Sequence, residues 1–224
     1  MPRIERVNAG GYIYHALNRA NARVQIFNTD ADYRAFEEIL KEGVDKFSMR
    51  LLAYCLMPNH WHLVLYPHND EDLSTFMGWI TNTHTRRWHT REGTIGEGHL
   101  YQGRYKSFLC QNDAHFLTLV RYVERNAKKA NLVQRAEKWR WSSVWRREYG
   151  TDDEKKLPSK WPVPIPQRYL SWLHEPQTIA EEESLGQSEK RSAPFGSDHW
   201  VDSMVTKFDI EQTRRPRGRP KKGG

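Results

Sequence analysis

Two histidines that stand two residues apart, His60 and His62, have the spacing in this chain that most directly allows chemistry. The apolar residues around them, within residues 56–65, predict a β-strand. Side chains two apart on a strand point to the same face, so the two imidazoles can grip one metal ion together. The intervening Trp61 points to the opposite face, which predicts one buried face and one chemical face. Two ligands make an incomplete metal site, so a third ligand must come from elsewhere in the chain.

A predicted helix over residues 114–130 supplies two further polar groups, Tyr122 and Asn126, which lie one turn apart on its flank. A hard divalent ion such as Mg²⁺ or Mn²⁺ accepts imidazole beside oxygen ligands and keeps positions open for substrate oxygens. His60, His62 and Asn126 are therefore candidate ligands of Mg²⁺ or Mn²⁺. Such an ion polarises a phosphodiester, and the Tyr122 phenol is then a candidate nucleophile that would form a phosphotyrosine intermediate.

Simpler interpretations of the same residues exist. A His-x-His pair is often an ordinary strand surface, and Tyr122 could be a packing aromatic with its hydroxyl bonded locally. Tyr101 and Tyr105 are rival nucleophiles, although neither has a helical partner four residues away. His115 is interpreted as a helix-start residue or a DNA contact. The remaining histidines considered, expected near solvent or phosphate, are His68, His84, His89 and His99.

The predicted elements that must position these groups alternate in the order β-α-β-β-α-β, followed by the Tyr122 helix. They cover residues 12–18, a helix that starts at 29–30, residues 49–57, the histidine strand, a helix to about residue 91, residues 105–110 and residues 114–130. This order is typical of the α+β class, with a ferredoxin-like (RRM-like) antiparallel sheet. We expect two helices on one face of the sheet and the Tyr122 helix near the other.

Three regions are predicted along the chain. Residues 1–150 form a catalytic domain, and residues 151–195 form a proline-rich linker or surface segment, because residues 160–166 hold too many prolines for a helix. Polar residues from about 175 to 194 show no periodicity and are expected to be irregular and mobile. Residues 196–224 carry one small helix and an irregular basic tail.

The charge balance favours a polyanionic partner. The 224 residues include 35 Lys and Arg against 28 Asp and Glu, a formal net charge of +7, which points to nucleic acid. The basic residues predicted to hold phosphates near the site could otherwise be solvated surface residues. They are Arg19, Arg23, Arg86, Arg87, Arg104 and Lys106. Several of the nine tryptophans are available to stack on unpaired bases.

The tail at residues 214–222 is a second DNA signal. Its arginines Arg215, Arg217 and Arg219 surround Gly218, an arrangement that suits a narrow A·T-rich minor groove, as in an AT-hook. A disordered basic tail that contacts phosphates alone is the open alternative.

Composition also excludes several classes. Two cysteines, Cys55 and Cys110, cannot build a disulfide framework or a thiolate zinc site. No stretch approaches the ~20 apolar residues of a membrane span. We therefore expect a soluble cytoplasmic protein with no membrane partner.

Four runs of residues, in order within residues 11–145, resemble the HUH-type single-strand transposases. The chain is most similar to the REP-associated tyrosine transposases, relatives of the small insertion-sequence transposases. The runs are residues 18–21, 53–63, 98–107 and 121–126, and the Arg-Gly-Arg-Pro sequence at 217–220 is also similar.

The resemblance implies that His60 and His62 are the paired ligands, Asn126 the third ligand and Tyr122 the nucleophile. It implies cleavage of single-stranded DNA beside a hairpin of a repetitive extragenic palindrome, leaving a 5′-phosphotyrosine and a free 3′-hydroxyl, in association with the bacterial nucleoid. Two alternatives stay open: a non-catalytic domesticated DNA-binding protein that recognises repeats, and a replication initiator or relaxase with the same active-site plan. A monomer or a homodimer is expected, and Tyr122 could serve the histidines of either chain.

Overall fold

The strands of the computed structural model, which describes residues 6–214, form one antiparallel sheet. Its strands are β1 (Ile13–Arg19), β2 (Arg50–Met57), β3 (His60–Tyr66) and β4 (Lys106–Cys110), in the order β2-β3-β1-β4. The strands β2 and β3 form a hairpin, with Pro58-Asn59 as its turn. This topology confirms the predicted α+β, ferredoxin-like sheet.

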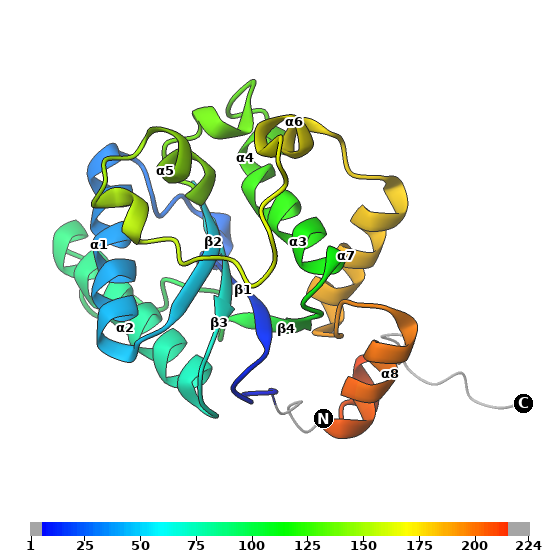
Figure 1. Ribbon diagram of the computed structural model, residues 1–224. Coiled ribbons are helices and arrows are strands. Elements are labelled where there is room, and N and C mark those ends of the chain that lie inside the picture. Colours follow the sequence, from blue (N-terminus) through cyan, green and yellow to red (C-terminus); the bar gives the residue numbers. More distant parts are fainter. Residues whose placement is uncertain (1–5, 215–224) are drawn as a thin grey trace, which may run out of the picture.

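Helices lie on both faces of the sheet (Figure 1). The helices α1 (Asp30–Phe47) and α2 (Asp72–Glu92) cover one face, where Phe36, Trp61 and Phe76 belong to one buried apolar cluster. On the other face α3 (Ala114–Glu124) packs apolar residues such as Phe116 against the sheet. The alternation along each strand thus feeds two cores, and the second core surrounds the chemical face.

The start and end of the Tyr122 helix are fixed by polar side chains. The Asp113 carboxylate accepts a 2.8 Å hydrogen bond from the backbone N–H of His115 and so caps the start of α3. The helix predicted over residues 114–130 is divided at Arg125, after which α4 (Asn126–Lys129) continues the chain. Asn126 therefore begins a short second helix, and does not lie in the middle of a long one.

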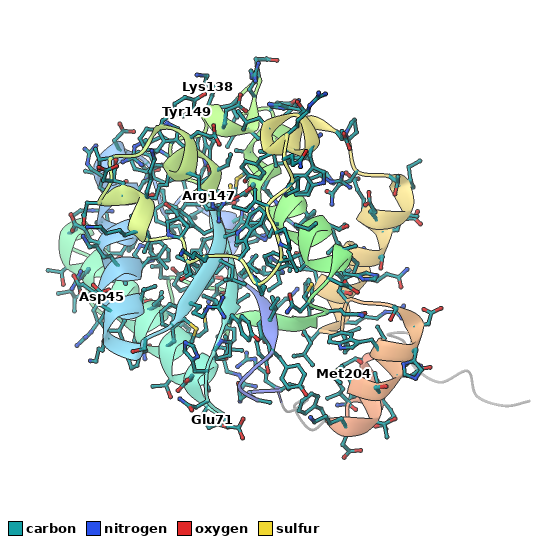
Figure 2. All side chains as sticks on the ribbon, in the orientation of Figure 1. Asp45, Glu71, Lys138, Arg147, Tyr149 and Met204 are labelled. Carbon is teal, nitrogen blue, oxygen red and sulfur yellow. The ribbon has the colours of Figure 1, made fainter. Side chains whose placement is uncertain are left out.

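A buried polar cluster anchors the end of α3 to the sheet. The fully buried Glu124 carboxylate accepts hydrogen bonds from Ser143 and Arg147 on α5 (Ser143–Tyr149). Arg147 also donates to the backbone carbonyl of Leu52 on β2, and Figure 2 shows Arg147 among the side chains above that strand. Because a buried carboxylate is costly without partners, this cluster holds the register of α3 over the sheet.

The segment after residue 150 is more ordered than the sequence suggests. The prediction that residues 175–194 are irregular and mobile was wrong, because α7 (Ile179–Arg191) begins with a capping box of Thr178 and Glu181 and buries Leu185. Its polar composition hid the helix, since few of its side chains are buried. The other helices are α6 (Tyr169–His174), α8 (Asp198–Lys207), and the short 3-10 turns Asn21–Arg23, Ala136–Lys138, Glu154–Lys156 and Glu211–Thr213.

Within residues 6–214, no helix is long and apolar enough to cross a membrane. Cys55 and Cys110 are both buried and unbridged. The predicted boundaries at residues 150 and 195 stay predictions, although α8 lies where one small helix was expected.

Candidate active site

The two histidines of β3 lie on the same face of the sheet, as the strand alternation predicts. Their ring centroids are 5.0 Å apart and their planes are nearly perpendicular. His60 is partly exposed at the start of β3, whereas His62 is 2% exposed. Asn59 Oδ1 lies 2.6 Å from His60 Nδ1. An amide oxygen can only accept, so His60 Nδ1 carries the proton and donates this hydrogen bond. His60 then keeps its lone pair on Nε2.

Tyr122 and Asn126 meet these histidines within a single chain. The Tyr122 ring lies edge-on to His62, with centroids 5.9 Å apart, and Asn126 Nδ2 lies 3.4 Å from His62 Nε2. The four residues predicted to act together are therefore neighbours in space, and α3 with α4 bring the phenol and the amide. The Asn126 amide carries an oxygen as well as this NH₂ group, and a half-turn of the amide brings the oxygen to the same place.

The rival tyrosines are on the wrong side of the sheet. Tyr101 accepts a 2.9 Å hydrogen bond from Trp61 Nε1 and contacts His84 Nδ1 at 2.5 Å, in the core under α1 and α2. Tyr105 is buried in the same core. His84 is 4% exposed, so the expectation that it faces solvent or phosphate was wrong. His115, by contrast, lies at the start of α3, as predicted.

Sequence reasoning missed His15, which completes the cluster on the sheet. His15 Nε2 lies 2.9 Å from His62 Nδ1, and the two rings stack with centroids 5.1 Å apart. The alternation of β1 already places His15 and Leu17 on one face, but only the pairing of Leu17 with His62 shows which face that is. The alternation of β1 was therefore readable from the sequence, but the pairing of β1 with β3 was not.

Burial keeps these imidazoles uncharged. It lowers the pKa of His60 to about 4, with the nearby Arg19 guanidinium as the second cause. Burial likewise holds the pKa of His62 well below its usual value, with repulsion from His60 and His15 added, and lowers the pKa of His15 to about 3. A neutral imidazole has one nitrogen lone pair, the form that binds metal ions.

A carboxylate from α7 contacts the phenol. The Tyr122 hydroxyl donates a 3.1 Å hydrogen bond to Glu189 Oε2. Burial, followed by the Glu189 charge, raises the pKa of Tyr122. Sequence reasoning missed Glu189 because residues 175–194 were expected to be irregular, and no local pattern links it to a tyrosine 67 residues earlier.

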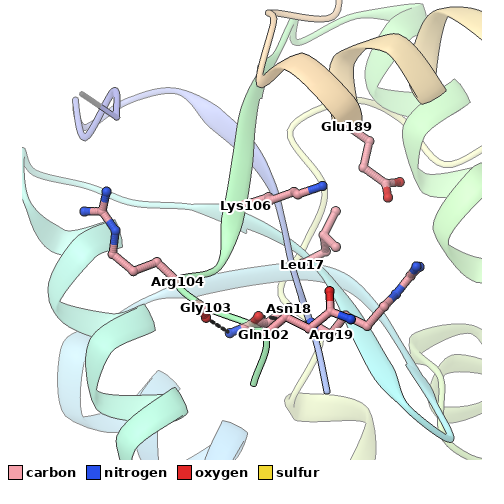
Figure 3. Close-up of a pocket in the computed structure, with 8 residues that line it drawn as sticks. All are labelled: Leu17, Asn18, Arg19, Gln102, Gly103, Arg104, Lys106 and Glu189. Atoms are coloured by element: carbon pink, nitrogen blue, oxygen red, sulfur yellow. Dashed lines mark hydrogen bonds between the residues drawn. The ribbon is translucent and has the colours of Figure 1, made fainter. Parts of the chain in front are cut away.

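Three of the predicted basic residues line one cavity beside the site. Arg19, Arg104 and Lys106 surround it together with Glu189, and Figure 3 shows these side chains around the opening. Arg19 pairs in register with His60, which places it next to the paired histidines. The other residues of the cavity wall are Leu17, Asn18, Gln102 and Gly103.

The remaining predicted basic residues lie elsewhere. Arg23 is exposed, and its backbone carbonyl accepts a hydrogen bond from Asn59 in the turn before His60. Arg86 and Arg87 line a separate hollow on α2, away from the histidines, and Arg87 is paired with Glu42 at 2.8 Å. The tail arginines 215, 217 and 219 lie outside the described residues.

The candidate metal donors at this site are two imidazole nitrogens and one amide oxygen. Within the described part of the chain, no three His, Cys, Asp or Glu side chains converge as a metal site. The available donors are His60 Nε2, His62 Nε2 and the Asn126 amide. Two imidazoles and one amide oxygen are compatible with Mg²⁺ or Mn²⁺. These ions accept imidazole beside oxygen ligands and keep coordination positions for water or substrate oxygens.

Comparison with known proteins identifies the family that this chain matches. The model of the family described as "Transposase IS200 like" matches residues 9–126, more than half of the chain. A sequence from Haemophilus influenzae that carries the name REP-associated tyrosine transposase is 22% identical over 119 residues, covering 50% of this chain and 68% of that relative. A solved REP-associated tyrosine transposase, bound to a REP hairpin, is 18% identical with a TM-score of 0.56, covering 80% of this chain and 99% of that one. This structural likeness confirms the fold.

Proposed function

This chain belongs to the IS200-like transposase family, and on that premise we propose that it cleaves and rejoins hairpin-flanked single-stranded DNA of the REP type through Tyr122. Support comes from one observation above all. The Tyr122 phenol lies against His62, and Asn126 reaches the same imidazole within one chain. A nucleophile and candidate metal ligands in one cluster are what phosphodiester cleavage without ATP requires.

The proposed role of each residue follows from its place. His60, His62 and Asn126 would hold Mg²⁺ or Mn²⁺, which polarises the phosphodiester when bound. Arg19, Arg104 and Lys106 would hold the DNA backbone in the cavity beside Tyr122. The phenol oxygen attacks phosphorus, a 5′-phosphotyrosine forms and the 3′-hydroxyl leaves. Attack by a 3′-hydroxyl on the phosphotyrosine would then rejoin strands.

The substrate proposal rests on the relatives. The solved neighbour is bound to a REP hairpin, and the net charge of +7 suits a polyanion. A hairpin presents a duplex stem next to an unpaired strand, which agrees with a cavity that is basic and open on one side of the sheet. We therefore propose hairpin-forming repeats of the chain's own genome as the substrate.

A covalent trapping experiment tests this function. The purified chain is incubated with labelled single-stranded repeat DNA and Mn²⁺ or Mg²⁺, then run on a denaturing gel. Wild type should give a denaturant-resistant adduct, and Tyr122→Phe should give none while binding the hairpin with unchanged affinity. Tyr105→Phe, a buried tyrosine of the opposite core, is the matched control and should still form the adduct. Hairpin binding by wild type without any adduct would favour the non-catalytic DNA-binding protein.

A further inference from the structure

Glu189 is held beside Tyr122 by the docking of a whole helix. Three contacts place α7 along α3 and α4: Leu185 is buried in the second core, Arg121 pairs with Glu181 at 2.7 Å, and Lys129 pairs with Glu182 at 2.9 Å. Glu189 follows Leu185 by four residues, so it lies on the same side of α7, one turn further on. Its carboxylate is therefore positioned at the phenol by contacts other than their own hydrogen bond.

The attack of Tyr122 on phosphorus requires that the phenol lose its proton. A tyrosine phenol carries its proton at physiological pH, and the Tyr122 hydroxyl donates that hydrogen to Glu189. Of the other groups around the ring, the Lys129 ammonium, 5.9 Å from the ring centre, carries only donors, and His62 is engaged by His15 and Asn126. The His15 ring lies edge-on to the phenol, with centroids 6.3 Å apart, and its free nitrogen makes no hydrogen bond to the Tyr122 hydroxyl. Glu189 alone among these neighbours receives the phenol hydrogen bond.

We propose that Glu189 is the general base of the cleavage step, a role that rests on the proposed function of this site. As the Tyr122 oxygen forms its bond to phosphorus, the phenol proton passes to Glu189 Oε2. The bond between phosphorus and the 3′-oxygen breaks, and that oxygen leaves with the electron pair and takes a proton from water. In the rejoining step a 3′-hydroxyl forms a bond to phosphorus and gives its proton to water. The bond between phosphorus and the Tyr122 oxygen breaks, and that oxygen takes the proton back from Glu189.

The charges around the carboxylate are compatible with a phosphate substrate. Glu189 lines the same cavity as Arg19 and Lys106, and Figure 3 shows its carboxylate on the side of the opening where Lys106 ends. A carboxylate next to a phosphodiester would repel it in isolation. Basic side chains on the cavity wall offset this repulsion, so DNA and Glu189 can occupy the site together.

The test compares single-turnover adduct formation in full-length variants at saturating DNA and metal. Glu189→Gln keeps the shape and a hydrogen-bonding group but cannot take a proton, and it should slow adduct formation by about 100-fold or more. Glu189→Asp should recover part of that rate because it retains a carboxylate. Glu189→Ala should be as slow as Glu189→Gln and should be accelerated by added formate, which can take the proton from solution.

Glu183→Gln is the matched control, since it makes the same charge change at an exposed position of α7 and should leave the rate unchanged. A Glu189→Gln rate equal to or above that of wild type would overturn the inference, because the contact would then be dispensable or would hold the phenol in a closed state. A loss that neither Asp nor formate recovers would also overturn it and indicate packing alone. Wild type that forms no adduct would overturn the proposed function itself, which separates the two failures.

Discussion

His15 Nε2 lies 2.9 Å from His62 Nδ1, and both rings are buried on the sheet face that α3 covers with Tyr122. One ring must donate and the other accept, and His15 Nδ1 has no hydrogen-bond partner among the described residues. If His62 donates, its lone pair lies on Nε2, the atom that faces Asn126. His15 thus stands where a supporting partner of a metal-binding histidine usually stands, and it would fix the tautomer and the ring orientation.

Replacing His15 should weaken metal binding more than it weakens the fold. His15→Ala removes the partner of His62, and loss of such a supporting group typically costs about 10- to 100-fold in metal affinity. Mn²⁺ affinity measured by calorimetry is the readout. His84→Ala is the matched control, because it empties an equally buried position in the opposite core. Equal losses in both variants would assign the effect to general destabilisation.

Replacing His60 should remove cleavage and metal dependence together. His60→Ala deletes one proposed ligand at a partly exposed position, so the fold should persist while adduct formation is lost. Adduct yield across a Mn²⁺ titration, with and without chelator, measures this. His68→Ala at an exposed position serves as the control. Cleavage by wild type in the presence of chelator would contradict the metal role.

Lys106 and Arg87 should differ in their contribution to DNA binding. Lys106 lines the cavity beside Tyr122, whereas Arg87 lies on α2 and is paired with Glu42. Lys106→Ala should weaken binding of all sequences alike and reduce the slope of log affinity against log salt by about 0.7 to 1, the effect of one phosphate contact. Arg87→Ala should leave the slope unchanged. Fluorescence anisotropy over a salt series measures both, and a reversed order would place the DNA on α2.

Buried His84 should make the fold sensitive to acid. Burial lowers the pKa of His84 to about 3, from about 6.5 when the chain is unfolded. Between these values the unfolded chain binds a proton that the folded chain does not, so stability is complete above about pH 6.5 and falls as the pH is lowered.

His84→Gln should therefore flatten the dependence of the unfolding free energy on pH, by up to about 1.4 kcal/mol per pH unit. Urea titrations between pH 7 and pH 5 measure the slope for both chains. The absolute stability of the variant can fall through loss of the Tyr101 contact without affecting this test. Parallel slopes in wild type and variant would contradict the prediction.

The sequence was sufficient for features that depend on local geometry. Alternation along β3 places His60 and His62 on one face, and the four-residue spacing places Asn126 one turn after Tyr122. The order of elements gave the sheet, because the β-α-β-β-α-β pattern leaves few ways to bury its apolar faces. The Asp113 cap at the start of α3 was also predictable, since its side chain bonds within its own turn.

Tertiary structure alone decided which distant groups join that site. His15 meets His62 through strand register, and Glu189 meets Tyr122 through the docking of α7, a helix whose polar sequence gave no periodic signal. Arg86 and Arg87, basic like Lys106, lie on another face because α2 packs beneath the sheet. Contacts between residues far apart in the chain depend on how apolar faces pack together, and residue type with local spacing cannot specify that packing.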